Sequence, residues 1–219
     1  MDNRFLYPEF WKQLALNDLA PYWYKNAPDR EYGGFYTNLS RKWEPLEPWD
    51  KYPAMVSRHV FGFSAAYLLS GDDKYIDAAS EGAGFLLDHA WDTEYGGWFD
   101  MLTRDGKPKI TEKSIPLQLY TNVGLAMYYF TAGDLRVLPY IYKSMDIQKT
   151  YGYDKEFGGY FQALSRDLRV LDSSKNKHAH YGYVGSLLLN LWLTTRKADV
   201  LDWGCELTDL TLDHMLDTE

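Results

Sequence analysis

The chain has 219 residues, of which 46% are hydrophobic and 25% charged, and its formal net charge is −8 at pH 7. This is an ordinary soluble composition, and the negative charge argues against a nucleic-acid partner, whose phosphates require clustered lysine and arginine. A lone cysteine, Cys205, excludes an internal disulfide and fits a reducing compartment, so we expect a cytoplasmic protein. No secretion signal and no apolar run of 18 residues is visible, so we expect no membrane partner.

Apolar residues at helical spacing predict helices in five stretches of the chain: 57–70, 72–90, 112–131, 177–195 and 197–215. Asp72 or Asp73 is suited to cap the second of them. The first, third and fourth are richly apolar, whereas the second and fifth each keep a polar face. The pattern therefore predicts alternating inner and outer helices.

A phrase of thirteen residues recurs between these helices. It reads DREYGGFYTNLSR at 29–41, DTEYGGWFDMLTR at 92–104 and DKEFGGYFQALSR at 154–166. The chain begins a fourth copy at Asp217, and the leading aspartates are 63, 62 and 63 residues apart. A fixed period of this size indicates one supersecondary unit that is stacked repeatedly.

Each copy of the phrase predicts a short β-hairpin. Its Gly-Gly pair supplies the positive φ that a tight reversal needs, and the aromatic residues that follow alternate with smaller ones. Asp105 to Pro108 carry a second turn signal. The aspartate that opens each copy and the arginine that closes it are predicted to pair across their own hairpin, with a structural role.

Each unit is expected to read helix, hairpin, helix, so the chain as a whole counts seven helices, including one ahead of the first and one ahead of the third hairpin phrase. These make three and a half helical hairpins, which form either an open solenoid or a closed ring. A ring of six such units needs about 378 residues, so the chain supplies a little over half of one. We expect a single incomplete all-α domain over 1–219, with an exposed apolar flank on the last helix. The residues expected on that flank are Leu201, Trp203, Leu207 and Leu210.

Polar residues that differ between the units stand at the start of each inner helix, as in a site built from non-identical repeats. The candidates are Arg58, His59, Gln118, Tyr120, Asn176, His178 and His180. Asn176 and His180 are four residues apart and share a face of the predicted helix, whereas His178 points elsewhere. A buried Arg58 needs anionic or carbonyl partners. Without an HExxH or CxxC motif, no metal site is expected.

These phrases resemble the N-acylglucosamine 2-epimerase family, which includes cellobiose 2-epimerases and aldose–ketose isomerases. The resemblance rests on DREYGGF, on Arg58 ahead of an aromatic helix, and on Asn-Lys-His-Ala-His at 176–180. It implies an (α/α)6 barrel, of which this chain covers about the first half. It also implies that Arg58, Asn176 and His180 line the sugar pocket, and that the family's two acid/base histidines belong to later repeats.

The chemistry that the resemblance implies is removal of the proton beside a sugar carbonyl by histidine, with an arginine stabilising the enediolate. We assign His180 and Arg58 as catalytic residues and the other five candidates as substrate-binding residues. No cofactor is required, the partner is a small sugar, and a homodimer is possible. Without the later repeats, the chain alone is expected to be inactive.

Two other functions stay open at this stage. An α/α-barrel glycoside hydrolase or lyase needs paired carboxylates, and Asp50, Glu112 and Asp172 precede the inner helices. The other is a non-catalytic carbohydrate-binding or scaffolding repeat protein.

Overall fold

The computed structural model describes residues 3–180 and 183–216. Its helices are η1 (Asn3–Leu6), α1 (Pro8–Gln13), η2 (Leu14–Leu19), α2 (Ala20–Asn26), α3 (Pro53–Ser70), α4 (Asp73–Phe85), η3 (Leu86–Ala90), α5 (Ile115–Ala132), η4 (Leu135–Val137), α6 (Leu138–Ile147), η5 (Gln148–Gly152), η6 (Lys177–Ala179), η7 (Val184–Leu189), α7 (Asn190–Thr195) and α8 (Ala198–His214). Its strands are β1 (Met101–Leu102), β2 (Pro108–Ile110), β3 (Lys113–Ser114), β4 (Ala163–Leu164) and β5 (Val170–Asp172). Helices dominate, as the sequence predicts.

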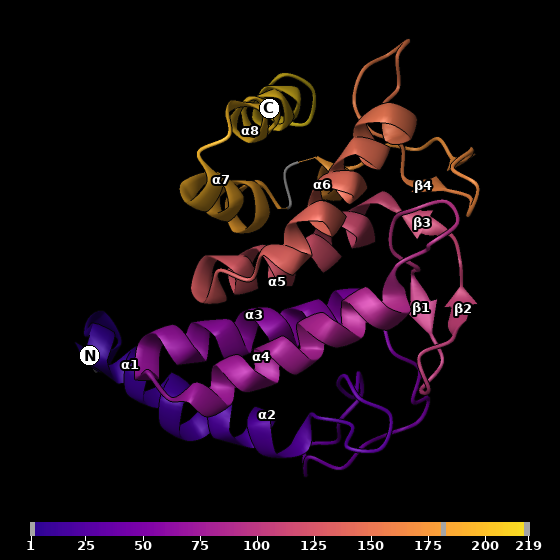
Figure 1. Cartoon of the computed structure of the whole chain (residues 1–219). Coiled ribbons are helices and arrows are strands. Elements are labelled where there is room, and N and C mark those ends of the chain that lie inside the picture. Colours follow the sequence, from indigo (N-terminus) through magenta and orange to yellow (C-terminus); the bar gives the residue numbers. More distant parts are fainter. Residues whose placement is uncertain (1–2, 181–182, 217–219) are drawn as a thin grey trace.

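The helices form three units and the start of a fourth. Unit 1 has α1, η2 and α2 as its outer helix and α3 as its inner helix; unit 2 has α4 and α5; unit 3 has α6 outside and η7 with α7 inside. Helix α8 begins the next unit. The helices stack side by side, and the hairpins gather at one end of the stack (Figure 1). Each inner helix therefore starts at the hairpin end.

Local sequence signals explain where the inner helices begin and end. Helices α3 and α5 each carry a proline in their first turn, and each ends at a left-handed glycine, Gly71 (φ 70°) or Gly133 (φ 68°). Asp72 caps the outer helix α4 by accepting from the Lys74 N–H at 3.2 Å. The helix predictions are confirmed here, although α5 begins three residues later than expected because Lys113 and Ser114 form β3.

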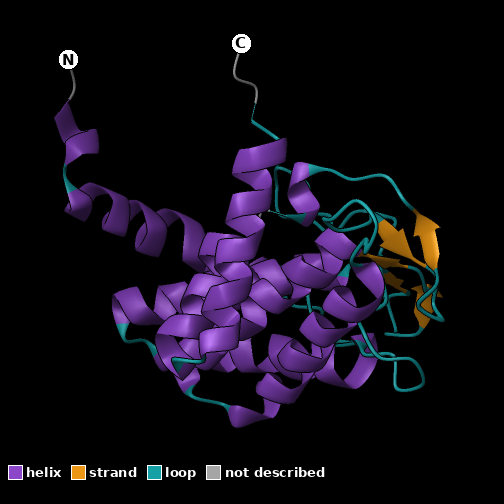
Figure 2. Cartoon of the chain, turned by 90° about the horizontal axis from the view of Figure 1, so that it is seen from above, coloured by secondary structure: helices purple, strands orange, loops and turns teal. Residues whose placement is uncertain are grey.

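The hairpins of successive units join into one band along the side of the molecule (Figure 2). Within a unit, the Gly-Gly turn is closed by a backbone bond from the Gly96 N–H to the Asp92 carbonyl at 2.8 Å. Between units, β3 of unit 2 pairs antiparallel with β4 of unit 3, and Lys51 bridges to Leu102 in the same way. The band fixes the spacing between one inner helix and the next.

The last helix corrects one prediction. Trp203 and Leu207 are 2% and 1% exposed, and the Trp203 indole N–H donates to the Tyr160 hydroxyl at 2.8 Å. Leu210 is partly buried, whereas Leu201 is 43% exposed. The prediction of an exposed apolar flank was wrong for Trp203 and Leu207, because α8 turns these side chains onto unit 3. It is confirmed for Leu201.

The third inner helix also differs from its prediction. Asn176 has an extended backbone (φ −148°, ψ 165°), and its side chain accepts from the N–H groups of His178 and Ala179, so only the short η6 follows it. His180 ends that turn. Asn176 and His180 therefore do not share a helix face. Within the described ranges, no helix has the length and apolar character to cross a bilayer.

Candidate functional site

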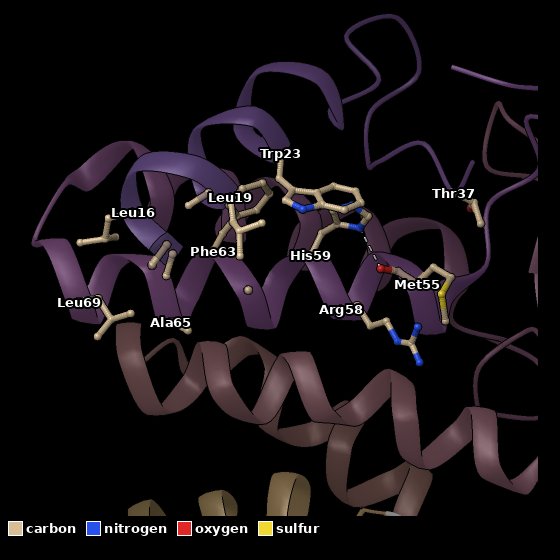
Figure 3. A pocket seen from close by; sticks show the side chains of 14 residues that line it. Leu16, Leu19, Trp23, Thr37, Met55, Arg58, His59, Phe63, Ala65 and Leu69 are labelled. Carbon is tan, nitrogen blue, oxygen red and sulfur yellow. Dashed lines mark hydrogen bonds between the residues drawn. The ribbon is translucent and has the colours of Figure 1, made fainter. Parts of the chain in front are cut away.

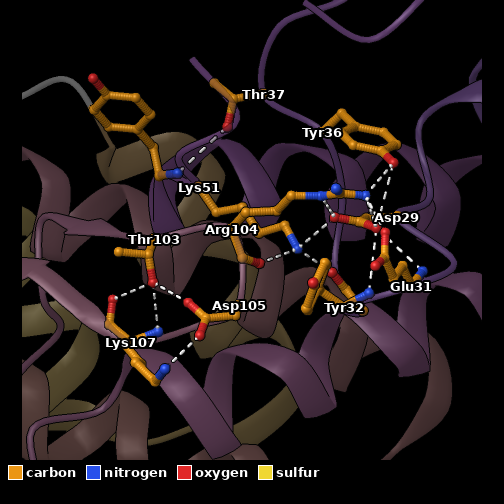
Figure 4. Close-up of polar contacts among 12 residues, drawn as sticks. Asp29, Glu31, Tyr32, Tyr36, Thr37, Lys51, Thr103, Arg104, Asp105 and Lys107 are labelled. Carbon is orange, nitrogen blue, oxygen red and sulfur yellow. Dashed lines mark hydrogen bonds and ion pairs between the residues drawn. The ribbon is translucent and has the colours of Figure 1, made fainter. Parts of the chain in front are cut away.

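A buried ion triad joins units 1 and 2 at the hairpin end. The Asp29 carboxylate lies 3.0 Å from the Lys51 amine of its own unit and takes two bonds from Arg104 of the next unit, at 2.9 and 3.1 Å (Figure 4). Burial by itself raises the pKa of Asp29, but the bonds from Arg104 and Lys51 outweigh it and lower the pKa to about 2. The prediction that each aspartate pairs with the arginine of its own hairpin was wrong, because the arginine reaches back to the preceding unit.

The same triad joins units 2 and 3. Asp92 lies 3.0 Å from the Lys113 amine and takes bonds of 3.0 and 3.2 Å from Arg166 of unit 3. Burial again opposes these bonds, and the pKa of Asp92 falls to about 2. We call each set of aspartate, lysine and following arginine a junction triad.

The two ends of the chain carry incomplete triads. Asp154 pairs with Lys175 at 2.6 Å, and no arginine of the described residues reaches it. Arg41, which occupies the place of Arg104 and Arg166 in unit 1, is exposed and has no ion-pair partner within the described ranges.

Two inner helices and the residue that precedes the third contribute side chains to one polar and aromatic cluster. The exposed Arg58 of α3 donates its Nε–H to the Tyr120 hydroxyl of α5, and its guanidinium carbon lies 4.5 Å from the Tyr120 ring centre. Tyr120 stacks on Tyr183, with ring centres 5.0 Å apart and planes inclined by 25°. Burial raises the pKa of Tyr183, and the Arg58 charge opposes that rise. Arg58 is thereby held in place while its guanidinium stays open to solvent.

His59 lies next to Arg58 but points to the other side of α3 (Figure 3). Its Nδ1 bonds the Met55 carbonyl at 3.0 Å, and its ring stacks on Phe35 at 4.7 Å. Burial lowers the pKa of His59 to about 4, so the ring is neutral at pH 7. It lines a mostly apolar cavity of about 520 Å³ between unit 1's outer helix and α3, which Trp23 and Arg58 also border.

Gln118 serves the hairpin of its own unit. Its amide oxygen accepts from the Trp98 N–H at 2.7 Å, and its amide nitrogen donates to the Trp98 carbonyl at 2.6 Å. The side chain is 1% exposed. The oxygen and the nitrogen of the Gln118 amide are thus both bonded to the backbone of Trp98, which corrects the expectation that Gln118 binds substrate.

His180 holds the same register in unit 3 as Gln118 in unit 2, five residues after the triad lysine. Its Nε2 accepts from the Tyr160 N–H at 2.9 Å, and its Nδ1 bonds the Asn176 carbonyl at 2.7 Å. The residue is fully buried, and this burial lowers its pKa. With both nitrogens engaged, His180 has no free lone pair to accept a proton from a sugar.

Asn176 and His178 flank this turn. Asn176 caps η6 and donates its amide to the side chain of Gln162, whereas His178 is exposed. The structure thus brings Arg58 and Tyr120 together, but it places neither Asn176 nor His180 on the cavity beside Arg58. Tyr183, which stacks on Tyr120, was not among the residues predicted for the site.

A second residue that sequence reasoning missed is Asp100. Both of its carboxylate oxygens accept from the Ser114 N–H, at 3.1 Å, at the start of α5. Burial raises the pKa of Asp100 to about 7, and the Glu112 charge adds to the rise. Thr37 and Gln162 occupy the same place in units 1 and 3.

Two of the three carboxylates considered for a hydrolase, Asp50 and Asp172, already have partners in the structure. Asp50 is bound to Lys109 at 2.6 Å. The Ser174 N–H lowers the pKa of Asp172, which is the wrong direction for a general acid. In the described residues no three histidine, cysteine or acidic side chains converge as metal ligands.

Fold and repeat together define a partial barrel of helical hairpins. The model of the N-acylglucosamine 2-epimerase family matches residues 34–134. The cellobiose 2-epimerase of Bacteroides fragilis is 29% identical over 206 residues, which are 89% of this chain and 52% of that protein. The cellobiose 2-epimerase of Ruminococcus albus is 32% identical over 163 residues, or 74% of this chain and 41% of that protein.

A solved structure agrees with these relatives. The sugar epimerase from a ruminal bacterium superposes with a TM-score of 0.83 at 28% identity, covering 93% of this chain and 54% of that one. The chain belongs to the N-acylglucosamine 2-epimerase family. It spans about half the length of the curated relatives it matches.

Proposed function

We propose that this chain forms part of a carbohydrate 2-epimerase or aldose–ketose isomerase, in which Arg58 stabilises the enediolate. The observation that carries the proposal is the exposed guanidinium of Arg58, fixed at the hairpin end of the inner helices by Tyr120 and Tyr183. Kinship with cellobiose 2-epimerases supports the reaction class. The sugar itself, a dimeric state and a cytoplasmic location stay predictions.

The geometry suits Arg58 to that role. Proton removal beside a carbonyl places negative charge on two sugar oxygens, and a preorganised cation stabilises that charge more than it stabilises the neutral substrate. The Nε–H of Arg58 is committed to Tyr120, which leaves the two terminal nitrogens to bond substrate oxygens. Stacking on the Tyr120 ring limits the motion of the guanidinium without neutralising it.

His180 takes a different role from the one expected of it. Because its two nitrogens hold the Tyr160 N–H and the Asn176 carbonyl, it fixes the hairpin of unit 3 against the inner helix. We assign it as a positioning residue. The general base then comes from the part of the longer relatives that this chain does not span, and the chain alone should not turn over sugar.

The test joins this chain to the unmatched remainder of the Bacteroides fragilis enzyme and follows cellobiose in D2O by NMR. We expect deuterium at C2 from the joined protein and none from the chain alone. Arg58→Gln should lower the exchange rate by about 100-fold or more. Arg169→Gln, at a solvent-exposed ion pair with Asp167 on a hairpin tip, is the matched control and should exchange at the parent rate.

Two results would contradict the proposal. One is conversion of cellobiose without deuterium at C2, which excludes proton abstraction. The other is an Arg58→Gln protein that exchanges as fast as the Arg169→Gln control.

A further inference from the structure

The inner helices α3 and α5 approach each other closely where Ser57 meets Gly124. Both residues are buried, and the Gly124 N–H donates to the Ser57 hydroxyl at 2.8 Å. A methyl group at position 124 would lie 2.7 Å from the Ser57 Oγ and closer still to the Ser57 carbonyl oxygen. The two helices come this near because Gly124 has no side chain.

The Ser57 hydroxyl bonds two backbone groups of α5 at once. It donates to the Tyr120 carbonyl at 2.8 Å and accepts from the Gly124 N–H at 2.8 Å. These two groups are four residues apart, and a regular α-helix joins such a pair directly. The hydroxyl therefore fixes the turn of α5 that carries Tyr120 relative to α3.

This buried contact and the contact between Arg58 and Tyr120 form one closed loop. Ser57 and Arg58 are neighbours on α3; the first bonds the Tyr120 carbonyl, and the second donates its Nε–H to the Tyr120 hydroxyl. Tyr120 is thus held at its backbone by a buried side chain and at its phenol by an exposed one. An unbonded arginine side chain samples many rotamers, and the buried contact sets the distance that Arg58 has to bridge.

We propose that Ser57 is a positioning residue of the Arg58 site and that Gly124 gives it access to α5. The hydroxyl holds the Tyr120 turn where the phenol bonds the Arg58 Nε–H, which leaves the terminal nitrogens of the guanidinium for substrate oxygens. The two helices do not need this hydroxyl to fold, because the Tyr120 carbonyl and the Gly124 N–H can bond each other. What the hydroxyl adds is the placement of Arg58.

The test observes the Arg58 Nε–H of this chain by 1H–15N NMR. The signal is assigned by its loss in Arg58→Gln, and its exchange with water is measured by magnetisation transfer. A bonded N–H exchanges slowly, because the bond must open first. Ser57→Ala should speed the exchange about fivefold. Gly124→Ala should speed it more, because its methyl group forces the helices apart.

Two substitutions of the same chemistry are matched controls. Ser64 lies two turns further along α3, is equally buried, and its hydroxyl has no hydrogen-bond partner among the described residues. Gly84 lies in α4, where an added methyl group meets open space. Ser64→Ala and Gly84→Ala should therefore leave the exchange of the Arg58 Nε–H at the parent rate.

The proposal is overturned if Ser57→Ala exchanges at the parent rate, or if Ser64→Ala speeds the exchange as much as Ser57→Ala does. It is also overturned if the Arg58 Nε–H of the parent exchanges as fast as that of free arginine, since no bond would then hold it. Circular dichroism verifies the fold of each variant. If Gly124→Ala fails to fold, the comparison of Ser57→Ala with Ser64→Ala decides alone.

The inference deepens the proposed function and rests on it only for a second measurement, in the joined protein. There Ser57→Ala should lower the rate of deuterium exchange at saturating cellobiose about tenfold and leave the KM near the parent value. A displaced cation loses its hold on charge that develops only in the transition state. Ser64→Ala should keep both parameters.

The two proposals fail in different ways. A joined parent protein without deuterium exchange would contradict the enzymatic role and leave the NMR result on Ser57 standing. A joined parent that exchanges deuterium, with Ser57→Ala as fast as Ser64→Ala, would contradict the positioning role and keep the enzymatic one.

Discussion

Units 2 and 3 each carry the aspartate–lysine pair of the junction triad. At the junction between units 2 and 3 an arginine completes the triad, whereas at the flank beyond unit 3 none of the described arginines does. At the junction, Lys113 and Asp92 are 0% and 1% exposed and Arg166 completes the triad. At the flank, Lys175 and Asp154 are 26% and 12% exposed, and no described arginine joins them. The comparison shows that burial of the ion pair depends on the following unit, whose hairpin covers it.

The largest effect expected of a single substitution compares the two lysines. Lys113→Met leaves a buried Asp92 with Arg166 alone, and we expect a loss of about 3 kcal/mol in the free energy of unfolding. Lys175→Met, at the half-open flank, should cost about 1 kcal/mol. Urea unfolding followed by tryptophan fluorescence measures both.

Lys107→Met is the control for this comparison. Its amine pairs with Asp105 on an exposed hairpin, and its loss should leave the free energy of unfolding close to the parent value. Equal costs at Lys113 and Lys175 would contradict the claim that the following unit buries the triad.

Acid should weaken the two complete junction triads, those of Asp29 and Asp92. Asp29 and Asp92 have folded-state pKa values of about 2, below the unfolded value near 4, so the folded state favours their charged form. Their contribution is present above pH 4 and is lost as the pH falls toward 2. Each supplies about 2 kcal/mol, or roughly 4 kcal/mol together.

Urea midpoints at pH 5, 4, 3 and 2.5 measure this loss. Asp92→Asn should reduce the change of the urea midpoint with pH by about half. A parent protein whose midpoint stays constant down to pH 2.5 would be inconsistent with both pKa shifts.

His180 and Gln118 give a second pair of matched positions. His180→Ala leaves the buried Tyr160 N–H without an acceptor, and we expect a loss of about 2 kcal/mol. His180→Gln should recover most of it, because glutamine performs this task for Trp98 in unit 2. Thermal unfolding compares the variants.

The His180→Gln variant also tests whether His180 acts as a positioning residue or as the base. In the joined protein, His180→Gln should retain deuterium exchange within about tenfold of the parent. Loss of exchange at unchanged stability would instead return His180 to the role of a base.

The smallest expected effect concerns Asp100, which faces the start of α5. Its folded pKa of about 7 lies above the unfolded value, so the folded state favours the protonated form. Stability should fall as the pH rises from about 4 to about 7 and then level off. Asp100→Asn keeps an acceptor for the Ser114 N–H and should gain about 1 kcal/mol at pH 8.

Urea unfolding at pH 5 and pH 8 tests this, with Asp167→Asn as an exposed control. An Asp100→Asn protein that is less stable than the parent at pH 8 would contradict it.

The repeat made most of the fold predictable. The 63-residue period fixed the number of units, and the Gly-Gly pairs adopt the positive φ that the hairpins require, as at Gly96 (φ 76°) and Gly97 (φ 79°). The partner of each repeated arginine was not predictable from one copy, because a period says which residues are equivalent and not whether they pair within a unit or between units.

The site was predicted less completely. Arg58 and Tyr120 were proposed because polar residues that open an apolar helix are conspicuous; the structure brings the two side chains together, and their role in a site stays a prediction. His180 was misread because helical periodicity was extended through Asn176, whose side chain caps the turn after it. Gln118 was misread because a buried amide bound to backbone looks the same in sequence as one that binds sugar.

The most direct test of the stacking of units is a double-mutant cycle on Asp92. Removing Asp92 together with Arg166 should reveal a favourable coupling energy, since the structure joins the two side chains across two units. The cycle of Asp92 with Arg104, its neighbour in the same hairpin phrase, should show none. Coupling to Arg104 in place of Arg166 would contradict the account.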